Sequence, residues 1–286
     1  MIDTITLNDI YQIKENHSLC LIDGKKKSFK QPAGDKNGIR TKVIIRNKET
    51  GEVVFVGRNK TMIAGSEFMA MKMFNLPHDS FITPTYNNAL NLDNTVNAAT
   101  PENMYCIQLF CIGTSGCNRE SSLVYEVDNK HWIYPDELVP FQYVPYSDDL
   151  TSAERNMYFG RKSLGDKQFY AYYFKKPDSD PVCKKQLEDG TPIDSTIYDD
   201  TTELHAQVLV TLSLSITKDD GRDYFINTTG INDGRFNCLS LCAAWTKVIS
   251  SYTYYQDIRP FTRINFPNKM FSDLGTSWDI VYRLYF

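Results

Sequence analysis

Cysteine and histidine side chains are the first candidates for chemistry, because both residue types bind metals and act in nucleophilic catalysis. The cysteines include the series Cys106-x4-Cys111-x5-Cys117 and Cys238-x3-Cys242, and the histidines are His17, His78, His131 and His205. Structural zinc sites prefer tight C-x2–4-C pairs, whereas Cys106 and Cys111 lie in an apolar run with different strand parity. Cys238 and Cys242 share parity, as core residues would. We therefore predict buried or free thiols of a reducing compartment, with no metal and no cofactor, and a Cys/His nucleophile pair remains an alternative.

Paired carboxylates are the second candidate, because glycoside hydrolases use two of them. The pairs are Asp148-Asp149, Asp199-Asp200 and Asp219-Asp220. None fits the twelve-residue calcium loop, and Asp beside Gly is ordinary turn chemistry. Phosphate-cradling glycine motifs and the H-E-x-x-H motif do not occur in the sequence. The prediction is a protein that is not an enzyme, with a polysaccharide hydrolase as an alternative that needs two converging carboxylates.

Lysine and tyrosine side chains are candidates for contacts with other molecules. Residues 24–38 hold five lysines together with Gly and Pro, which predicts a solvated loop or arm. Tyr is enriched at contact hot spots, and the sequence is rich in Tyr near 141–146 and 252–255. The predicted interface residues are Lys25, Lys26, Lys27, Tyr86, Tyr143, Tyr146, Tyr252, Tyr254 and Tyr255. The alternative is that these tyrosines pack against the protein's own sheets.

Overall composition restricts the partners. The 286 residues carry 31 basic and 35 acidic side chains, a formal net charge of −4, so we expect no nucleic-acid partner. No run approaches about 18 consecutive apolar residues, so we expect no membrane span. The N-terminus MIDTITLNDI lacks the pattern of a secretory signal. Aromatic residues make up 13% of the chain and favour strands.

Alternating and β-branched runs dominate the chain. Strands are expected near 43–45, 53–56, 104–112, 157–161, 168–174, 207–217, 236–245, 258–266 and 278–286. In 207–217 we place Val208, Val210, Leu212, Leu214 and Ile216 on one face, with Leu209 as the one mismatch. Helices are expected near 7–13 and over 63–74. These signals predict an antiparallel β-sandwich with one or two short helices and long loops.

The predicted domain organisation follows from the same pattern. Residues 1–40 are expected to form an N-terminal helix and a basic arm. Residues 41–286 are expected to form a single β-sandwich domain. Two long polar insertions, near 78–103 and 176–202, interrupt it. Long loops of this kind usually carry interactions.

Several segments follow one another in a characteristic order: Asn59-Lys60 before the helix that contains Gly65 and runs to Phe74, then Ile112-Gly113-Thr114, the strand 207–217, the segment 231–243, and Arg263–Pro267 followed by Trp278–Phe286. Together these segments resemble the β-rich attachment domain of phage tail-fibre and baseplate proteins. The most specific part is the last pair, R-x-x-F-P and W-x-x-x-Y-x-x-Y-F. The similarity covers about residues 41–286 and lies in spacing and residue type.

The resemblance implies a structural virion protein of a tailed bacteriophage. Such a protein would dock neighbouring tail, baseplate or collar proteins in a symmetric homo- or hetero-oligomeric assembly, after synthesis in the bacterial cytoplasm. Because no fibre shaft follows Phe286, it would be a free-standing component. A carbohydrate- or receptor-binding module is the alternative, with Trp132 or Trp245 as an aromatic platform.

Overall fold

The computed structural model describes most of the chain, in two compact units. The described residues are 4–6, 17–22, 25–30, 39–74, 85–86, 105–118, 120, 123–128, 130, 133, 137–147, 161–164, 166–187, 190–193, 206–230, 233–249, 252–271 and 276–286. Unit 1 combines residues 1–59, 177–216 and 278–286, and unit 2 combines residues 60–176 and 217–277. The range 41–286, for which the sequence predicts a single domain, is divided between these two units.

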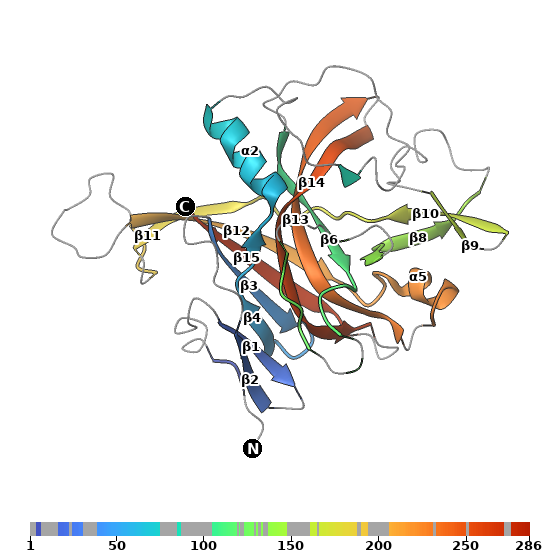
Figure 1. Cartoon of the computed structure of the whole chain (residues 1–286), viewed down its shortest axis with the longest axis horizontal. Helices are drawn as coiled ribbons and strands as arrows, with labels where there is room; N and C mark the ends of the chain where they lie inside the picture. Colours follow the sequence, from blue (N-terminus) through green and yellow to red (C-terminus); the bar gives the residue numbers. More distant parts are fainter. Residues whose placement is uncertain are drawn as a thin grey trace. The chain divides into compact units, whose positions relative to one another are not determined.

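Unit 1 is built on a seven-stranded sheet in which every pair of neighbouring strands is antiparallel. The strands, in spatial order, are β11 (Val182–Leu187), β12 (Ala206–Ile216), β15 (Trp278–Tyr285), β3 (Arg40–Asn47), β4 (Val53–Gly57), β1 (His17–Ile22) and β2 (Lys25–Lys30). Figure 1 shows them in succession from β12 to β2. The sheet therefore joins three distant stretches of sequence.

Local sequence explains the middle of this sheet. The β-branched runs of β3 and β4 form the predicted hairpin, and Gly51 in its turn has a φ of +70°. Burial alternates strictly along β15. In β12 the even positions from Leu212 to Ile216 are buried, as expected. At the start of the strand the prediction is wrong, because Val208 is exposed and Leu209 is buried. There the odd-numbered residues line a pocket.

Unit 2 contains a five-stranded and a three-stranded sheet. The first has the order β5 (Lys60–Thr61), β14 (Tyr252–Met270), β13 (Arg235–Ile249), β6 (Tyr105–Gly113), β7 (Leu138–Val139), and the second has the order β8 (Gln142–Pro145), β10 (Lys167–Tyr172), β9 (Arg161–Leu164). Side chains of both sheets, such as Cys111, Phe169 and Cys242, share one hydrophobic cluster. The fold class is thus mainly β, with antiparallel sheets, two described helices and loops, as predicted.

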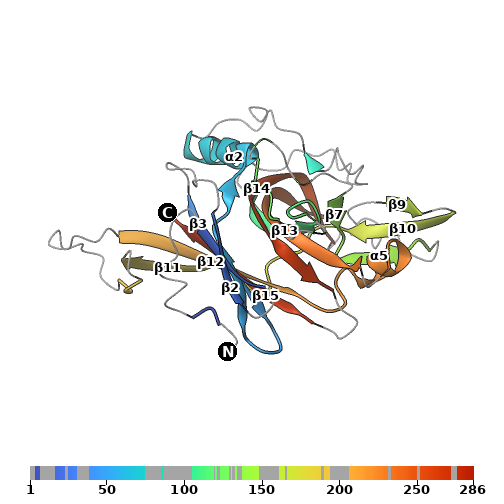
Figure 2. The ribbon, with the colours of Figure 1, turned by 60° about the horizontal axis from the view of Figure 1, so that its bottom comes forward.

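The two helices belong to unit 2. Helix α2 (Ile63–Phe74) has the predicted bounds and packs through Phe68 and Met71 on side chains of β6 and β13. Figure 2 shows the helix beside one end of β14. Gly65 lets its backbone approach β14 closely, because a Cβ there would lie 2.1 Å from the carbonyl oxygen of Phe261. Helix α5 (Arg222–Asn227) was not predicted. It follows the left-handed Gly221 at the end of the Asp219-Asp220 turn.

Two predicted loops contain strands. The basic arm 24–38 includes β2, which pairs with β1 as a hairpin in unit 1. The polar insertion 176–202 includes β11, which pairs with β12. The side chains of residues 25–28 and 182–185 are exposed, so the strands show no apolar alternation that a sequence pattern could detect. The predicted helix near 7–13 lies outside the described residues, and so does 78–103 apart from Thr85 and Tyr86.

Candidate anion-binding site

Three of the predicted interface tyrosines belong to the core of unit 2. Tyr86 is 0% exposed, Tyr143 1% and Tyr255 5%, and all three lie in the main hydrophobic cluster. The ring of Tyr143 stacks on Phe169 with centroids 4.3 Å apart. The structure therefore favours the alternative in which these tyrosines pack internally.

The other predicted interface residues are placed differently. Tyr146 is half-buried, with its ring 5.2 Å from that of Tyr170. Tyr252 and Tyr254 lie on β14, and their side chains fall outside the described part of the structure. Lys25, Lys26 and Lys27 are exposed on β2. The structure does not bring the lysines and the tyrosines together in one site.

The burial of the cysteines agrees with the strand parity that the sequence predicts for them. Cys106 is exposed and Cys111 is buried, and Cys238 and Cys242 are both fully buried. None of the seven cysteines, all of which are described, is in a disulfide bond, and the sulfur atoms of Cys111 and Cys242 lie 3.8 Å apart. Burial raises the pKa of the Cys111 thiol well above its usual value. Within the described residues, no three His, Cys, Asp or Glu side chains are grouped so that they could hold a metal ion.

One of the carboxylate pairs lies in the described structure. Asp220 accepts hydrogen bonds from the backbone N–H and hydroxyl group of Thr217, at 2.7 and 3.1 Å, and forms an ion pair with Lys175 at 2.8 Å. Its carboxylate is thus occupied in holding the turn before α5. Asp148-Asp149 and Asp199-Asp200 lie outside the described residues, as do His78, His131 and His205.

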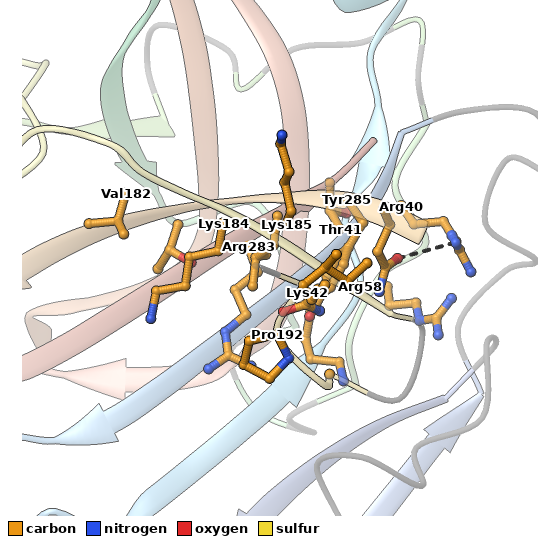
Figure 3. A pocket seen from close by; sticks show the side chains of 16 residues that line it. Arg40, Thr41, Lys42, Arg58, Val182, Lys184, Lys185, Pro192, Arg283 and Tyr285 are labelled. Atoms are coloured by element: carbon orange, nitrogen blue, oxygen red, sulfur yellow. Dashed lines mark hydrogen bonds between the residues drawn. The ribbon is translucent and has the colours of Figure 1, made fainter. Parts of the chain in front are cut away.

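A basic pocket on unit 1 is the strongest candidate site. Its volume is about 780 Å³, and it lies over the end of the sheet formed by β11, β12, β15 and β3 (Figure 3). The charged residues that line it are Arg40, Lys42, Arg58, Lys184, Lys185 and Arg283. No Asp or Glu is among its described lining residues. We call this site the basic pocket.

Strand pairing explains how these cations share one face. Two rows of directly paired residues cross the sheet: Lys42, Arg283, Thr211 and Val182, and Arg40, Tyr285, Leu209 and Lys184. Directly opposite residues of an antiparallel pair point to the same side. Lys185 has the other parity, and in Figure 3 its side chain points away from the other labelled cations. Four of the six cations therefore lie on one face of the sheet, and Arg58, which follows β4, lines the same pocket.

The pocket concentrates positive charge without a matching carboxylate in its described lining. Lys42 lies directly opposite Arg283, and like charges in such a pair are destabilising. Burial and the nearby charges of Arg58 and Arg283 lower the pKa of Lys42 to about 8. The Nε atom of Arg283 is buried and has no hydrogen-bond partner. Arg40 Nη2 donates to Gln207 Oε1 at 3.4 Å.

The basic pocket is not among the sites that the sequence predicts. Its cations come from three chain segments that only the sheet brings together. Two local signals were present. Arg40-x-Lys42 places two cations on one face of a strand, and Arg283 interrupts the apolar strand 278–286. Each signal alone is compatible with a solvated strand face.

The low pKa of Lys42 predicts a pH dependence of stability. The pKa of Lys42 is about 8 in the folded protein, whereas the pKa of an unperturbed lysine is 10.5. Between these values the unfolded chain holds more protons, so the free energy of unfolding should rise with pH from about 8 to 10.5. Urea denaturation at several pH values would measure the slope. The difference between wild type and Lys42→Met isolates this group, and parallel profiles of the two proteins would contradict the assignment.

Comparisons with known proteins identify a family. Residues 53–208 match the family of unknown function DUF7208. Because this match covers more than half of the chain, the protein belongs to that family. No curated protein matches the chain, and no solved structure does. The matched segment includes Arg58, Lys184 and Gln207 of the basic pocket. In the described part of the chain, no helix has the length and apolar character needed to cross a membrane.

Proposed function

We propose that the protein is a structural, non-catalytic docking protein of a tailed bacteriophage, acting in the tail, baseplate or collar. Two observations support this proposal: the resemblance in strand spacing, and a mainly β fold with antiparallel sheets. The observation that carries the docking role is strand β2. Its partners would be other virion proteins in a symmetric assembly.

Strand β2 has an unpaired edge that is suited to binding another molecule. It is the outermost strand of the seven-stranded sheet, and no described strand pairs with its outer edge. Residues Lys25–Ser28 are exposed on both faces of the strand. An open edge can accept a further strand through backbone hydrogen bonds. Edge lysines also prevent indiscriminate pairing, so a specific partner would carry acidic side chains next to its docking strand.

The two tryptophans named for the carbohydrate-binding alternative do not form an exposed platform in the described structure. Trp245 is half-buried, and its ring meets Tyr105 edge to face at 6.0 Å. Trp132 lies outside the described residues. No described contact therefore favours the alternative over docking.

Cross-linking mass spectrometry on purified phage particles tests the proposal. We expect cross-links from Lys25, Lys26 and Lys27 to acidic segments of other virion proteins. Changing these three lysines to Glu should reduce incorporation into particles by about tenfold, the effect of roughly 1.4 kcal/mol. A matched triple change at the exposed lysines Lys130, Lys167 and Lys218 should leave it unaltered. Absence of the chain from particles, or equal losses with both triple variants, would refute the proposal.

A further inference from the structure

We propose that copies of this chain associate head to tail, with strand β2 of one copy pairing in parallel with the open edge of strand β11 in the next copy. The two strands occupy the opposite ends of the seven-stranded sheet of unit 1 (Figure 1). The inference rests on the docking role proposed for β2, and it names the partner of that strand as a second copy of the protein.

Strand β11 is open to a further strand over its first half. Residues 191–193 fold back along the outer edge of its second half, where the Ile193 N–H donates to the Lys185 carbonyl oxygen at 3.1 Å. No described residue pairs with the outer edge of residues 182–184, and Val182 is 48% exposed there. Backbone hydrogen bonds can add a strand to such an edge. The sheet thus has two open edges, one on β2 and one on β11.

The directions of the strands determine how two copies can join. Every neighbouring pair in the seven-stranded sheet is antiparallel, so the first and the last strand of the sheet point the same way. A second copy that continues the sheet in the same orientation therefore places its β11 parallel to β2 of the first copy. Such an interface is heterologous, because each copy contributes a different edge to it.

Charge favours this pairing over the pairing of identical edges. Lys25 and Lys27 are exposed and lie on the same face of β2, because they are two residues apart. Asp178 and Asp180 are exposed in the bend that leads into β11. Opposite charges on neighbouring strands stabilise their pairing, whereas like charges directly opposite each other destabilise it. Two β2 edges would bring lysines together, whereas β2 beside the β11 edge brings lysines to carboxylates.

One parallel register satisfies these requirements together. When Phe29 lies beside Val182 of the next copy, the two lysines of β2 lie beside the bend that carries the two aspartates. The last residue of β2, Lys30, then lies beside Cys183. Strand β2 therefore ends before Lys185, where the outer edge of β11 is already occupied by residues of its own chain.

Sedimentation velocity of the purified full chain, from about 1 to 200 µM, tests the inference. We expect self-association with a dissociation constant below about 100 µM. Species larger than dimers should appear as the concentration rises, because a heterologous interface leaves one open edge at each end of the assembly. Association should weaken when sodium chloride is raised from about 50 to 500 mM, because salt screens the contacts between lysines and aspartates.

Charge reversal at the two edges provides a matched pair of variants. Lys25→Glu/Lys27→Glu should weaken self-association by about tenfold or more, because carboxylates would then meet carboxylates. Asp178→Lys/Asp180→Lys should have the same effect, because lysines would then meet lysines. An equimolar mixture of the two variants should associate again, because the unchanged β2 of one variant meets the unchanged β11 edge of the other. The two reversed edges also complement each other.

A control variant on unit 2 separates this effect from a general change of charge. Lys130→Glu/Lys167→Glu alters two exposed lysines that lie outside unit 1, and it should associate like wild type. Circular dichroism checks that every variant is folded. An equal loss of association in the control and in the edge variants would contradict the proposed interface.

Two further results would overturn the inference. One is a wild-type chain that stays monomeric at about 200 µM. The other is a mixture of the two edge variants that remains as weakly associated as each variant alone. The measurement needs no phage particle, so its failure is distinguishable from failure of the docking role. A monomeric chain that is nevertheless cross-linked through β2 to a different protein in particles would retain the docking role and reject the second copy as its partner.

Discussion

Replacing Gly65 by alanine should destabilise unit 2 by about 3 kcal/mol, since overpacking at a rigid contact costs this much. The new Cβ would lie 2.1 Å from the carbonyl oxygen of Phe261 and 2.9 Å from its carbonyl carbon, so helix α2 would have to move away from β14. A destabilising effect is unusual for this substitution, because Gly→Ala inside a helix normally stabilises the folded state by about 1 kcal/mol. Hydrogen exchange of α2 and β14 amides would report the loss.

The neighbouring residue gives the control for Gly65→Ala. Ser66 is exposed on α2, and its hydroxyl group makes only a long 3.5 Å hydrogen bond to the Met62 carbonyl oxygen. Ser66→Ala should therefore change stability by less than about 0.5 kcal/mol. If Gly65→Ala proved as stable as wild type, α2 would not be held in close backbone contact with β14.

Replacing Asn237 by alanine should destabilise unit 2 by about 2–4 kcal/mol, through unsatisfied buried groups and a small cavity. Asn237 is fully buried on β13. Its Oδ1 accepts from the backbone N–H of Gly116 at 2.6 Å, and its Nδ2 donates to Asn268 Oδ1 at 2.9 Å and to the Cys117 carbonyl oxygen at 3.4 Å. Alanine would leave the buried Gly116 N–H without this acceptor.

Asn268→Ala is the matched comparison, because it removes only one of these bonds. Asn268 is half-buried, so water can replace its partner, and we expect a loss below about 1 kcal/mol. Urea denaturation followed by hydrogen exchange of β6 and β13 would rank the two variants. Equal losses of stability in the two variants would show that the hydrogen bond between Gly116 and Asn237 contributes little to the stability of unit 2.

Elements with a strong local pattern could be predicted from sequence. Helix α2 has the expected bounds, and β3, β4 and β15 follow from β-branched or alternating residues. Strands β2 and β11 could not be predicted, since their exposed side chains carry no alternation. Tyr86, Tyr143 and Tyr255 were assigned to interfaces because composition alone cannot separate a core tyrosine from a contact residue.

The basic pocket could not be predicted for a different reason. Arg283 lies opposite Lys42 only because β15 inserts beside β3, and this pairing spans most of the chain. Net charge gave no indication, because the total of −4 hides a local excess of cations. Local patterns thus predict elements, whereas the site depends on the pairing of strands that are distant in sequence.

The position of β15 has a consequence for synthesis on the ribosome. It is the last strand of the sequence, yet it lies between β12 and β3 in the sheet. Until residues 278–285 have been translated, β11–β12 and the β3–β4–β1–β2 group have no strand to join them. Non-local pairing of this kind is slow, and open strand edges favour aggregation. The nascent chain therefore carries two unjoined half-sheets from the end of β12 at Ile216 until β15 begins at Trp278, and this is the period when chaperones would be most needed.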